Sequence, residues 1–214
     1  GFEYSDADHP RHEGWGPAYA WRTYGGAALS FDPANPIHAN NAHYAVLDVS
    51  KPGDAMANTG FDGIAVKQGD TYLLSLFGRM VEGNGRRVRV ALRTKDGREI
   101  GSATVTLPRD GWRKLDAKIK ATETAADAEL AIMPEAAGRY AFDMVSLFPK
   151  DTYKGRRNGL RRDLAEAIAN LKPRFVRFPG GCVAHGNGIQ NIYRWKNTVG
   201  PLESRKGMAN IWRY

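Results

Sequence analysis

The chain has 214 residues, of which 42% are hydrophobic and 25% charged, and its formal net charge is +8. This composition is typical of a globular protein with one large domain or two modest ones. The sequence has no run of about 18 apolar residues that could span a bilayer, so we expect no membrane partner. The first ten residues lack the basic start and apolar stretch of a signal peptide, so secretion or export to the periplasm would need such a peptide before them.

One cysteine and the distribution of basic residues exclude further classes. Cys182 has no second cysteine for a disulfide, and it cannot form a cysteine-based zinc site alone. Arginines in the segment 86–93 alternate with valine and leucine, which is typical of the solvated face of a half-buried strand. We therefore expect no nucleic-acid partner.

Residues 1–43 are rich in Gly, Pro, Asn and Asp and show no helical period, so we expect irregular structure with two short strands. From residue 44 to 148, short alternating runs separated by turn residues predict eight antiparallel strands of a β-sandwich. These runs are HYAVLDV, FDGIAV, TYLLSLFGRM, RVRVALRT, ATVTLP, WRKLDAKIKA, AELAIMP and YAFDMVSLF. Lys95-Asp96-Gly97 contains the Asp-Gly pair of a tight hairpin turn.

After Pro149 the pattern changes from strand to helix. The stretch 158–172 predicts an amphipathic helix that Asn158 is placed to cap and Pro173 to end. Its apolar stripe consists of Leu160, Leu164, Ile168 and Leu171. The following FVRF, residues 175–178, predicts a short strand, and a helix followed by a strand is the unit that builds parallel sheets and barrels.

The segment FVRFPGGCVAHGN, residues 175–187, ends this strand in a Pro-Gly-Gly loop. In barrels and open α/β sheets ligands bind at the C-terminal strand ends, where glycine permits close backbone approach. A Gly-Gly pair after a strand is, however, more often a simple turn than a ligand-binding loop. Neither GxGxxG nor GxxxxGK[ST] occurs in the sequence, so a phosphate-binding loop is not indicated.

The longer segment RFPGGCVAHGNGIQNIYRWKNTVGPLESRKGMANIW resembles the glycoside hydrolase family 51 α-L-arabinofuranosidases, as do residues 143–178 and the segment PIHANNAHYAVLDV. Gly1-Phe2-Glu3-Tyr4 resembles the end of a further motif of that family. The resemblance implies a (β/α)8 barrel with a jelly-roll-like, carbohydrate-module-like β-sandwich inserted after the first barrel strand. The expected domains are 1–14 from the first barrel strand and loop, 15–149 as the sandwich, and 150–214 as an incomplete start of the barrel.

The same resemblance implies a retaining glycosidase, which uses two carboxylates about 5 Å apart as nucleophile and as acid/base. The acid/base of the family lies in a Gly-Asn-Glu motif, and no Asn-Glu pair occurs here. We expect both catalytic groups beyond Tyr214, which would make this chain a fragment. Of its own glutamates we expect these to be solvated: Glu13, Glu82, Glu99, Glu123, Glu129, Glu135, Glu166 and Glu203.

Five residues are candidate contacts at the sugar site, and Arg177 is among them because it alternates with Val176 and Phe178 and would project inward from the predicted strand. Glu3 matches a glutamate that accepts hydrogen bonds from arabinofuranose hydroxyls, with a solvated terminal carboxylate as the alternative. Gly181 and Cys182 match the loop that borders the pocket, where the thiol would contribute shape. Trp195 matches an aromatic beside the sugar or is a core residue. Arg177 would orient a catalytic carboxylate or form a structural ion pair.

The resemblance therefore predicts release of terminal arabinofuranosyl groups from arabinan- or arabinoxylan-type polysaccharides, with no metal or cofactor. The remainder of the barrel is the expected partner, and homo-oligomers are common in the family. The alternative is a non-catalytic carbohydrate-binding sandwich. Its candidate stacking residues, for which core packing is the more common role, are Trp15, Tyr19, Trp21, Tyr24, Trp112 and Tyr140.

Overall fold

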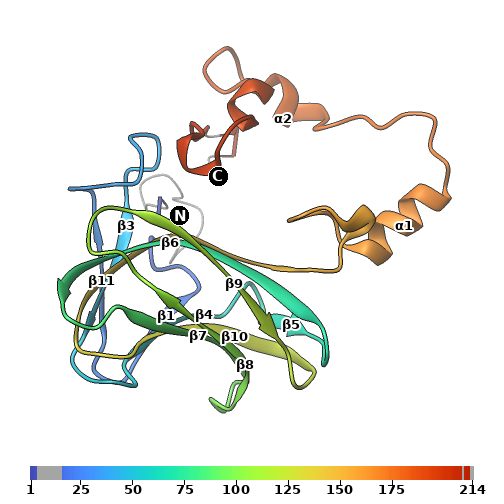
Figure 1. The fold of residues 1–214 in the computed structure, drawn as a ribbon. Helices are drawn as coiled ribbons and strands as arrows, with labels where there is room; N and C mark the ends of the chain where they lie inside the picture. The colour runs from blue at the N-terminus through green and yellow to red at the C-terminus, as the bar shows by residue number, and fades with distance from the viewer. Residues whose placement is uncertain (4–15, 209, 213–214) are drawn as a thin grey trace.

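The computed structural model describes residues 1–3, 16–208 and 210–212, and it shows a two-layer β-sandwich followed by a short helical segment (Figure 1). One sheet has the order β1-β4-β10-β7-β8, with β5 paired to β10, and the other has the order β2-β3-β11-β6-β9. Every pairing between these strands is antiparallel.

The strands of the first sheet are β1 (Trp21–Tyr24), β4 (Ala55–Asn58), β5 (Ile64–Val66), β7 (Arg87–Arg93), β8 (Glu99–Thr106) and β10 (Ala125–Pro134). Those of the second are β2 (Ala28–Asp32), β3 (Tyr44–Val49), β6 (Thr71–Gly83), β9 (Arg113–Lys120) and β11 (Gly138–Pro149). The helices are η1 (Tyr153–Gly155), α1 (Arg162–Asn170), α2 (Gly181–His185), η2 (Trp195–Thr198) and η3 (Leu202–Ser204). None of the described helices is long and apolar enough to cross a bilayer.

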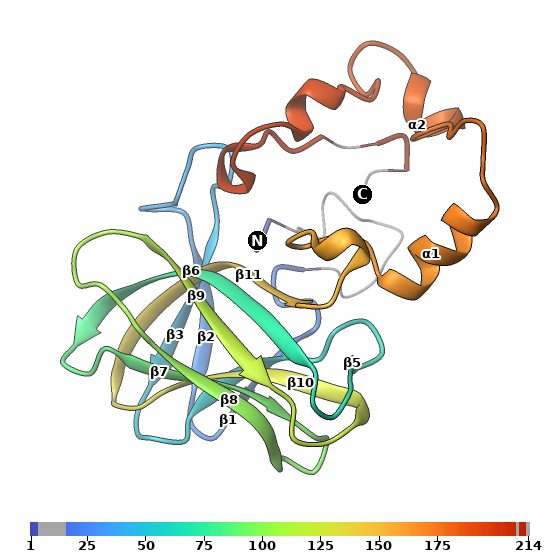
Figure 2. The same cartoon turned by 45° about the vertical axis from the view of Figure 1, so that its right-hand side comes forward.

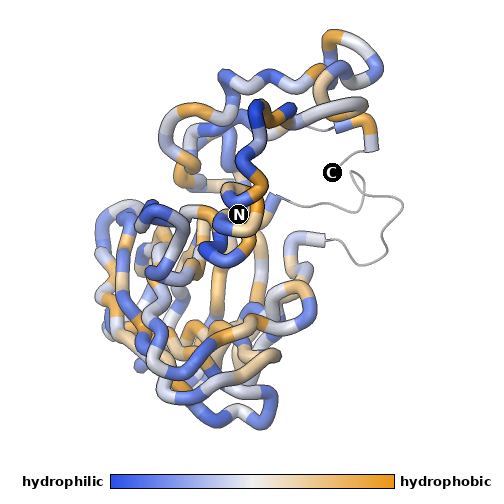
Figure 3. Tube along the Cα trace, turned by 90° about the vertical axis from the view of Figure 1, so that its right-hand side faces the viewer, coloured by the Kyte–Doolittle hydropathy of each residue, from blue (hydrophilic) through white to orange (hydrophobic). Residues whose placement is uncertain are grey.

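The hydrophobic core lies between the two sheets, where alternate side chains of each strand point inward. In β6 the inward positions from Tyr72 to Met80 are buried, and the positions between them are only partly covered. In β7, Val88, Val90 and Leu92 are fully buried while the arginines face outward, as the alternation predicted. Figure 3 shows hydrophobic residues interspersed with hydrophilic ones throughout the sandwich.

The strands predicted for the sandwich are present, and the structure adds one that the sequence pattern did not indicate. β1 and β2 are the two short strands expected in the N-terminal region. The hairpin at Lys95-Asp96-Gly97 is confirmed: Gly97 has a φ of +87°, and its amide donates to the Thr94 carbonyl at 2.9 Å. β4, with the sequence AMAN, was missed because three small or polar residues give no alternation signal.

One predicted surface glutamate is buried, and that prediction was wrong. Glu129 is 2% exposed, because its carboxylate is enclosed by three donors from β1 and β7 of the same sheet. It accepts hydrogen bonds from the Tyr24 hydroxyl at 2.6 Å, from Arg93 Nη2 at 2.6 Å and from Arg22. Both guanidinium groups also lie over the Tyr24 ring, at 5.0 and 4.6 Å from its centroid. The pairing offsets the cost of removing the carboxylate from water.

The other predicted surface glutamates divide into three groups. The five that the structure leaves exposed are Glu82, Glu99, Glu123, Glu135 and Glu166. Glu203 is partly covered, and Glu13 lies outside the described residues.

Helix α1 forms where the apolar stripe predicted it, but it begins at Arg162 and Asn158 does not cap it. Asn158 has a φ of +50° within a turn in which the Gly159 amide donates to the Arg156 carbonyl at 3.0 Å. This turn and the bridge between Thr152 and Arg161 close the loop before the helix can start. The helix ends ahead of Pro173, as expected.

The apolar stripe of α1 is not covered by other described residues. The exposed fractions of Leu160, Leu164, Ile168 and Leu171 are 70%, 55%, 58% and 80%. The predicted strand at 175–178 is also not formed, and Phe175 and Phe178 are 82% and 80% exposed. A parallel strand needs neighbours to satisfy its backbone groups, and no described strand lies beside this one. Figure 2 places the whole segment on the side of the sandwich that carries β6, β9 and β11.

We predict that Glu129→Gln lowers the free energy of unfolding by about 3 kcal/mol, because it removes the buried anion that pairs with Arg22 and with the largely covered guanidinium of Arg93. Burial raises the pKa of the Glu129 carboxyl, but the hydrogen bonds from Tyr24, Arg22 and Arg93 outweigh it and hold this pKa below its ordinary value of 4.5. The contribution of the carboxylate is therefore complete above about pH 4.5 and is lost as the pH falls through the lower folded pKa. Urea unfolding of wild type and variant at several pH values measures both effects.

The matched control is Glu135→Gln, which removes a half-exposed carboxylate that accepts from Arg87 Nε at 2.8 Å. An exposed pair contributes about 0.5 kcal/mol. Equal destabilisation by the two substitutions would contradict the structural role given to Glu129.

Candidate functional site

The N-terminal residues Gly1–Glu3 are held on the sandwich by Phe2. Its ring is 1% exposed and packs against the rings of Trp21 and Phe31, with centroids 5.4 and 5.5 Å apart. This anchor leaves the adjacent Glu3 side chain 40% exposed. The Glu3 carboxylate accepts from the backbone amide of His43 at 2.7 Å and lies 2.9 Å from His43 Nδ1. Glu3 is thus held at the start of β3 with part of its acceptor capacity open to a ligand.

The Pro-Gly-Gly loop leads directly into the short helix α2. Gly180 and Gly181 have φ values of +80° and +46°, in the left-handed region that favours glycine. A Cβ at either position would meet no atom within 4 Å, so the loop borders open space. The Cys182 thiol in the first turn of α2 is free and exposed. The role of Gly181 and Cys182 in bordering a sugar pocket stays a prediction.

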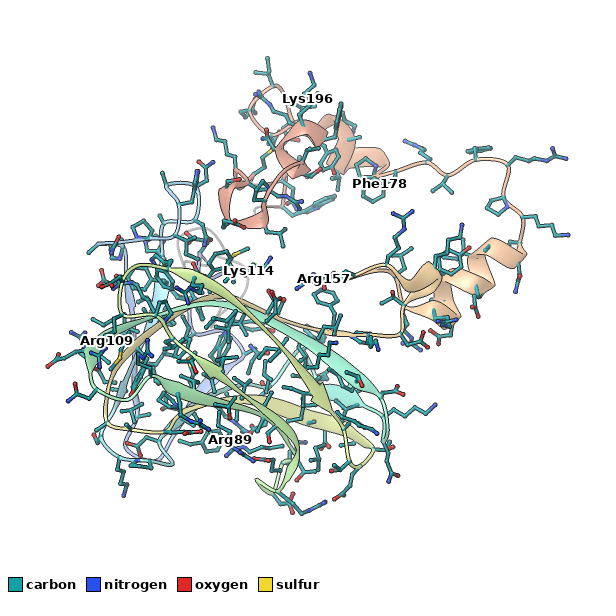
Figure 4. All side chains as sticks on the ribbon, in the orientation of Figure 1. Arg89, Arg109, Lys114, Arg157, Phe178 and Lys196 are labelled. Carbon is teal, nitrogen blue, oxygen red and sulfur yellow. The ribbon has the colours of Figure 1, made fainter. Side chains whose placement is uncertain are left out.

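Trp195 and Arg177 are both exposed rather than packed. Trp195 begins η2 with 61% of its surface exposed, and the Lys196 ammonium lies 5.9 Å from its ring centroid. Arg177 lies on the extended segment between α1 and α2 and is also exposed. Residues 178–212 are called the C-terminal segment here. Figure 4 shows Phe178, next to Arg177, at the start of this segment and Lys196 within it.

A pocket of about 290 Å³ lies within the C-terminal segment and includes residues that sequence reasoning did not assign. Its lining residues are Val183, Asn191, Tyr193, Asn197, Thr198, Lys206, Met208 and Asn210. Asn191 Oδ1 accepts from the Asn187 amide at 2.8 Å, and Tyr193 meets Phe178 edge-on with centroids 6.3 Å apart. Tyr193 and Asn197 lie two residues on either side of Trp195 in the sequence. This proximity is the only sequence signal that could have indicated them as pocket residues.

A hydrogen bond joins residues 202–204 to the sandwich. The Asn40 side-chain amide donates to the Ser204 carbonyl at 2.8 Å, which places η3 beside the loop before β3. Glu3 contacts His43 a few residues further on. Among the described residues no hydrogen bond or ion pair joins Glu3 to Arg177, Cys182 or Trp195, so their convergence on one ligand stays a prediction.

The six aromatic candidates of the sandwich have different surroundings. Tyr140 is a core residue whose hydroxyl donates to the Gly85 and Ala136 carbonyls. Trp112 donates to the Asn35 carbonyl at 2.8 Å, and the Tyr24 hydroxyl is engaged by Glu129. Trp15 lies outside the described residues.

The remaining two candidates, Tyr19 and Trp21, line a pocket of about 440 Å³ at one edge of the sandwich. Phe61, on the loop between β4 and β5, also lines it and is 84% exposed. Asn58 and Ser146 supply polar groups to the same pocket. Aromatic faces beside a few hydrogen-bonding groups form a surface suited to a sugar ring. Phe61 was missed because it was assigned to a strand, although its position between Gly60 and Asp62 is typical of a turn.

No cluster of three or more His, Cys, Asp or Glu side chains with metal-binding geometry occurs in the described part of the chain.

Comparison with known proteins identifies both parts of the chain. Residues 1–138 match the family described as carbohydrate binding domain, and residues 167–214 match the alpha-L-arabinofuranosidase 1 domain. The extracellular exo-α-L-arabinofuranosidase of Streptomyces chartreusis is 37% identical over 225 residues, which cover all of this chain and 26% of that protein. Alpha-L-arabinofuranosidase 1 of Arabidopsis thaliana is 34% identical over 76% of this chain and 24% of its own length.

The solved structure of an arabinose-bound glycoside hydrolase family 51 α-L-arabinofuranosidase matches with a TM-score of 0.82 at 30% identity, over 92% of this chain and 34% of that one. The chain belongs to the carbohydrate-binding domain family, whose match covers more than half of its residues. The resemblance to family 51 and the expected fold class are confirmed. The chain spans about a quarter to a third of the relatives that it matches.

Proposed function

We propose that this chain is the N-terminal portion of a retaining α-L-arabinofuranosidase that releases terminal arabinofuranosyl groups from arabinan- or arabinoxylan-type polysaccharides. The observation that carries the proposal is the match to an arabinose-bound family 51 enzyme over 92% of the chain. The sandwich corresponds to residues 15–149 and the start of the barrel to residues 150–214.

The exposed apolar residues after β11 support the barrel as the destination of this segment. The leucines and isoleucine in and beside α1 and the phenylalanines at 175 and 178 are all large apolar side chains that are exposed. A helix with one apolar stripe is stable when that stripe packs against a sheet. Neighbouring barrel strands would cover the stripe and would pair with residues 175–178.

In the assembled site this chain would supply one wall of the sugar pocket. The exposed Glu3 oxygens are suited to accept hydrogen bonds from sugar hydroxyls, and Trp195 offers an apolar face to sugar C–H groups. Arg177 would orient a carboxylate. The two reacting carboxylates would come from the polypeptide that completes the barrel, and water would resolve the covalent glycosyl intermediate.

The decisive experiment joins this chain to the C-terminal three quarters of the Streptomyces relative and assays hydrolysis of 4-nitrophenyl α-L-arabinofuranoside. We expect the fusion to be active and this chain alone to be inactive, because the chain lacks both reacting carboxylates. In the fusion, Trp195→Ala should lower kcat/KM by about tenfold or more through lost contact with the sugar.

Phe61→Ala is the matched control, since it removes an exposed aromatic ring from the sandwich and not from the barrel segment. Its kcat/KM on the small substrate should equal that of the unsubstituted fusion. An inactive but folded fusion would count against the proposal, as would full activity of the Trp195 variant.

A second function, carbohydrate binding by the sandwich itself, is favoured by the pocket beside Trp21 and Phe61. We predict that calorimetric titration of the chain with arabino-oligosaccharides gives millimolar binding that Phe61→Ala weakens about tenfold, because one aromatic platform is lost. Leu160→Ala, at another largely exposed apolar position but on the barrel segment, should leave binding unchanged. Binding that survives Phe61→Ala would exclude this pocket as the sugar site.

A further inference from the structure

The outer face of the second sheet carries a basic surface that neither function uses. In β9 the outward positions are Lys114, Asp116, Lys118 and Lys120. β9 and residues 150–157 each contain four Lys or Arg residues and one Asp. These two short segments therefore hold most of the net positive charge of the chain.

Strand pairing places the basic residues around an apolar floor. Leu73 of β6 pairs with Lys118 on one side and with Phe148 of β11 on the other. In the next row, Thr71 pairs with Lys120, and its carbonyl accepts from the Lys150 amide at 2.8 Å. Residues two apart on a strand share a face, so the lysines border a strip formed by Leu73 and Phe148.

A cavity of about 540 Å³ opens on this face between the sheet and the segment that follows β11. Leu73, Lys118, Lys150 and Arg157 line it together with Asp116. Arg157 forms an ion pair with Asp116 and thereby holds the 150–157 segment against β9. Figure 4 shows Lys114 and Arg157 on the same side of the sandwich.

The cations that remain are available to a ligand. Asp116 is engaged by Arg157, and Asp151 forms an ion pair with Arg162. Among the described residues neither Lys118 nor Lys150 has a carboxylate within ion-pair distance. The unpaired ammonium groups of Lys118 and Lys150 thus border the cavity together with the partly exposed Leu73, and Phe148 lies beside Leu73 on the neighbouring strand.

We propose that this face binds the carboxylates of a uronate-bearing polysaccharide, so that the enzyme of the proposed function acts on arabinofuranosyl groups attached to acidic polymers. The inference rests on that proposed function. Lysine ammonium groups attract carboxylates, and the apolar strip suits the C–H face of a sugar ring. The carboxylate of Asp116 within the cavity and that of Asp151 nearby lower the density of positive charge, which disfavours a densely charged phosphate backbone.

The test is calorimetric titration of the chain with oligogalacturonate, with the same oligosaccharide after reduction of its carboxyl groups, and with neutral arabino-oligosaccharide. We expect oligogalacturonate to bind and its carboxyl-reduced form to bind at least about tenfold more weakly. The Kd should rise with salt, because exposed charges are screened. Lys118→Gln/Lys150→Gln should raise the Kd about tenfold, which corresponds to two exposed charge contacts.

The matched control is Lys51→Gln/Lys95→Gln, which removes the same charge from exposed lysines in the turns after β3 and after β7. Its Kd should stay within about twofold of the unsubstituted value, and thermal unfolding checks that both double variants are folded. The proposal is overturned if the reduced oligosaccharide binds equally well, if both double variants lose binding equally, or if single-stranded DNA binds as tightly as oligogalacturonate. Titration with the neutral arabino-oligosaccharide and the hydrolysis assay of the fusion test the proposed function without the acidic ligand. The proposed function and this inference can therefore fail independently of one another.

Discussion

The need to cover apolar faces governs this structure. Each sheet of the sandwich is apolar on one side, and the two sheets cover one another, so the core from Leu47 to Phe142 is almost completely removed from water. The segment after β11 has an apolar face of the same kind on α1, but the described residues provide no second layer for it. The sandwich is therefore self-sufficient, whereas residues 158–178 carry apolar surface that needs a partner.

Two connections relate this segment to the sandwich. β11 runs without interruption into residues 150–157, where the ion pair between Arg157 and Asp116 holds the chain against β9. At the C-terminal end of the segment, the Asn40 side-chain amide donates a hydrogen bond to the Ser204 carbonyl. This contact lies close to the point where Phe2 anchors Glu3. The sandwich thus holds one candidate sugar contact at its own surface while the loop with Cys182 extends from it. Completion of the barrel is what would bring the two together.

The alternation of the strands could be predicted from the sequence because inward and outward positions of a half-buried strand differ in polarity, as in β6 and β7. The strand β4 could not, because Ala and Asn carry little polarity signal and its position depends on partners 31 or more residues away. Glu129 was misassigned for a related reason. Its burial depends on Arg22 and Arg93, which are remote in sequence and reach it only once the four strands β1, β4, β10 and β7 are paired.

The candidate site was predictable only through the family motifs, because Gly-Gly after an apolar run has no specific chemistry. The motif located the loop with Gly181 and Cys182 and the exposed ring of Trp195. It could not predict that 175–178 remain extended without partners, since strand formation depends on neighbours and not on the residues of the strand alone. The same dependence explains why the apolar stripe of α1 was correctly located while its covering layer was not.

Amide hydrogen exchange across residues 162–178, compared between this chain and its fusion to the C-terminal part of the Streptomyces relative, tests the central claim most directly. The account predicts rapid exchange of residues 175–178 in the chain alone, and slowing by about 100-fold or more in the fusion, where barrel strands supply hydrogen-bond partners. Equal exchange rates in the two proteins, with the sandwich protected in both, would show that this segment does not join a barrel.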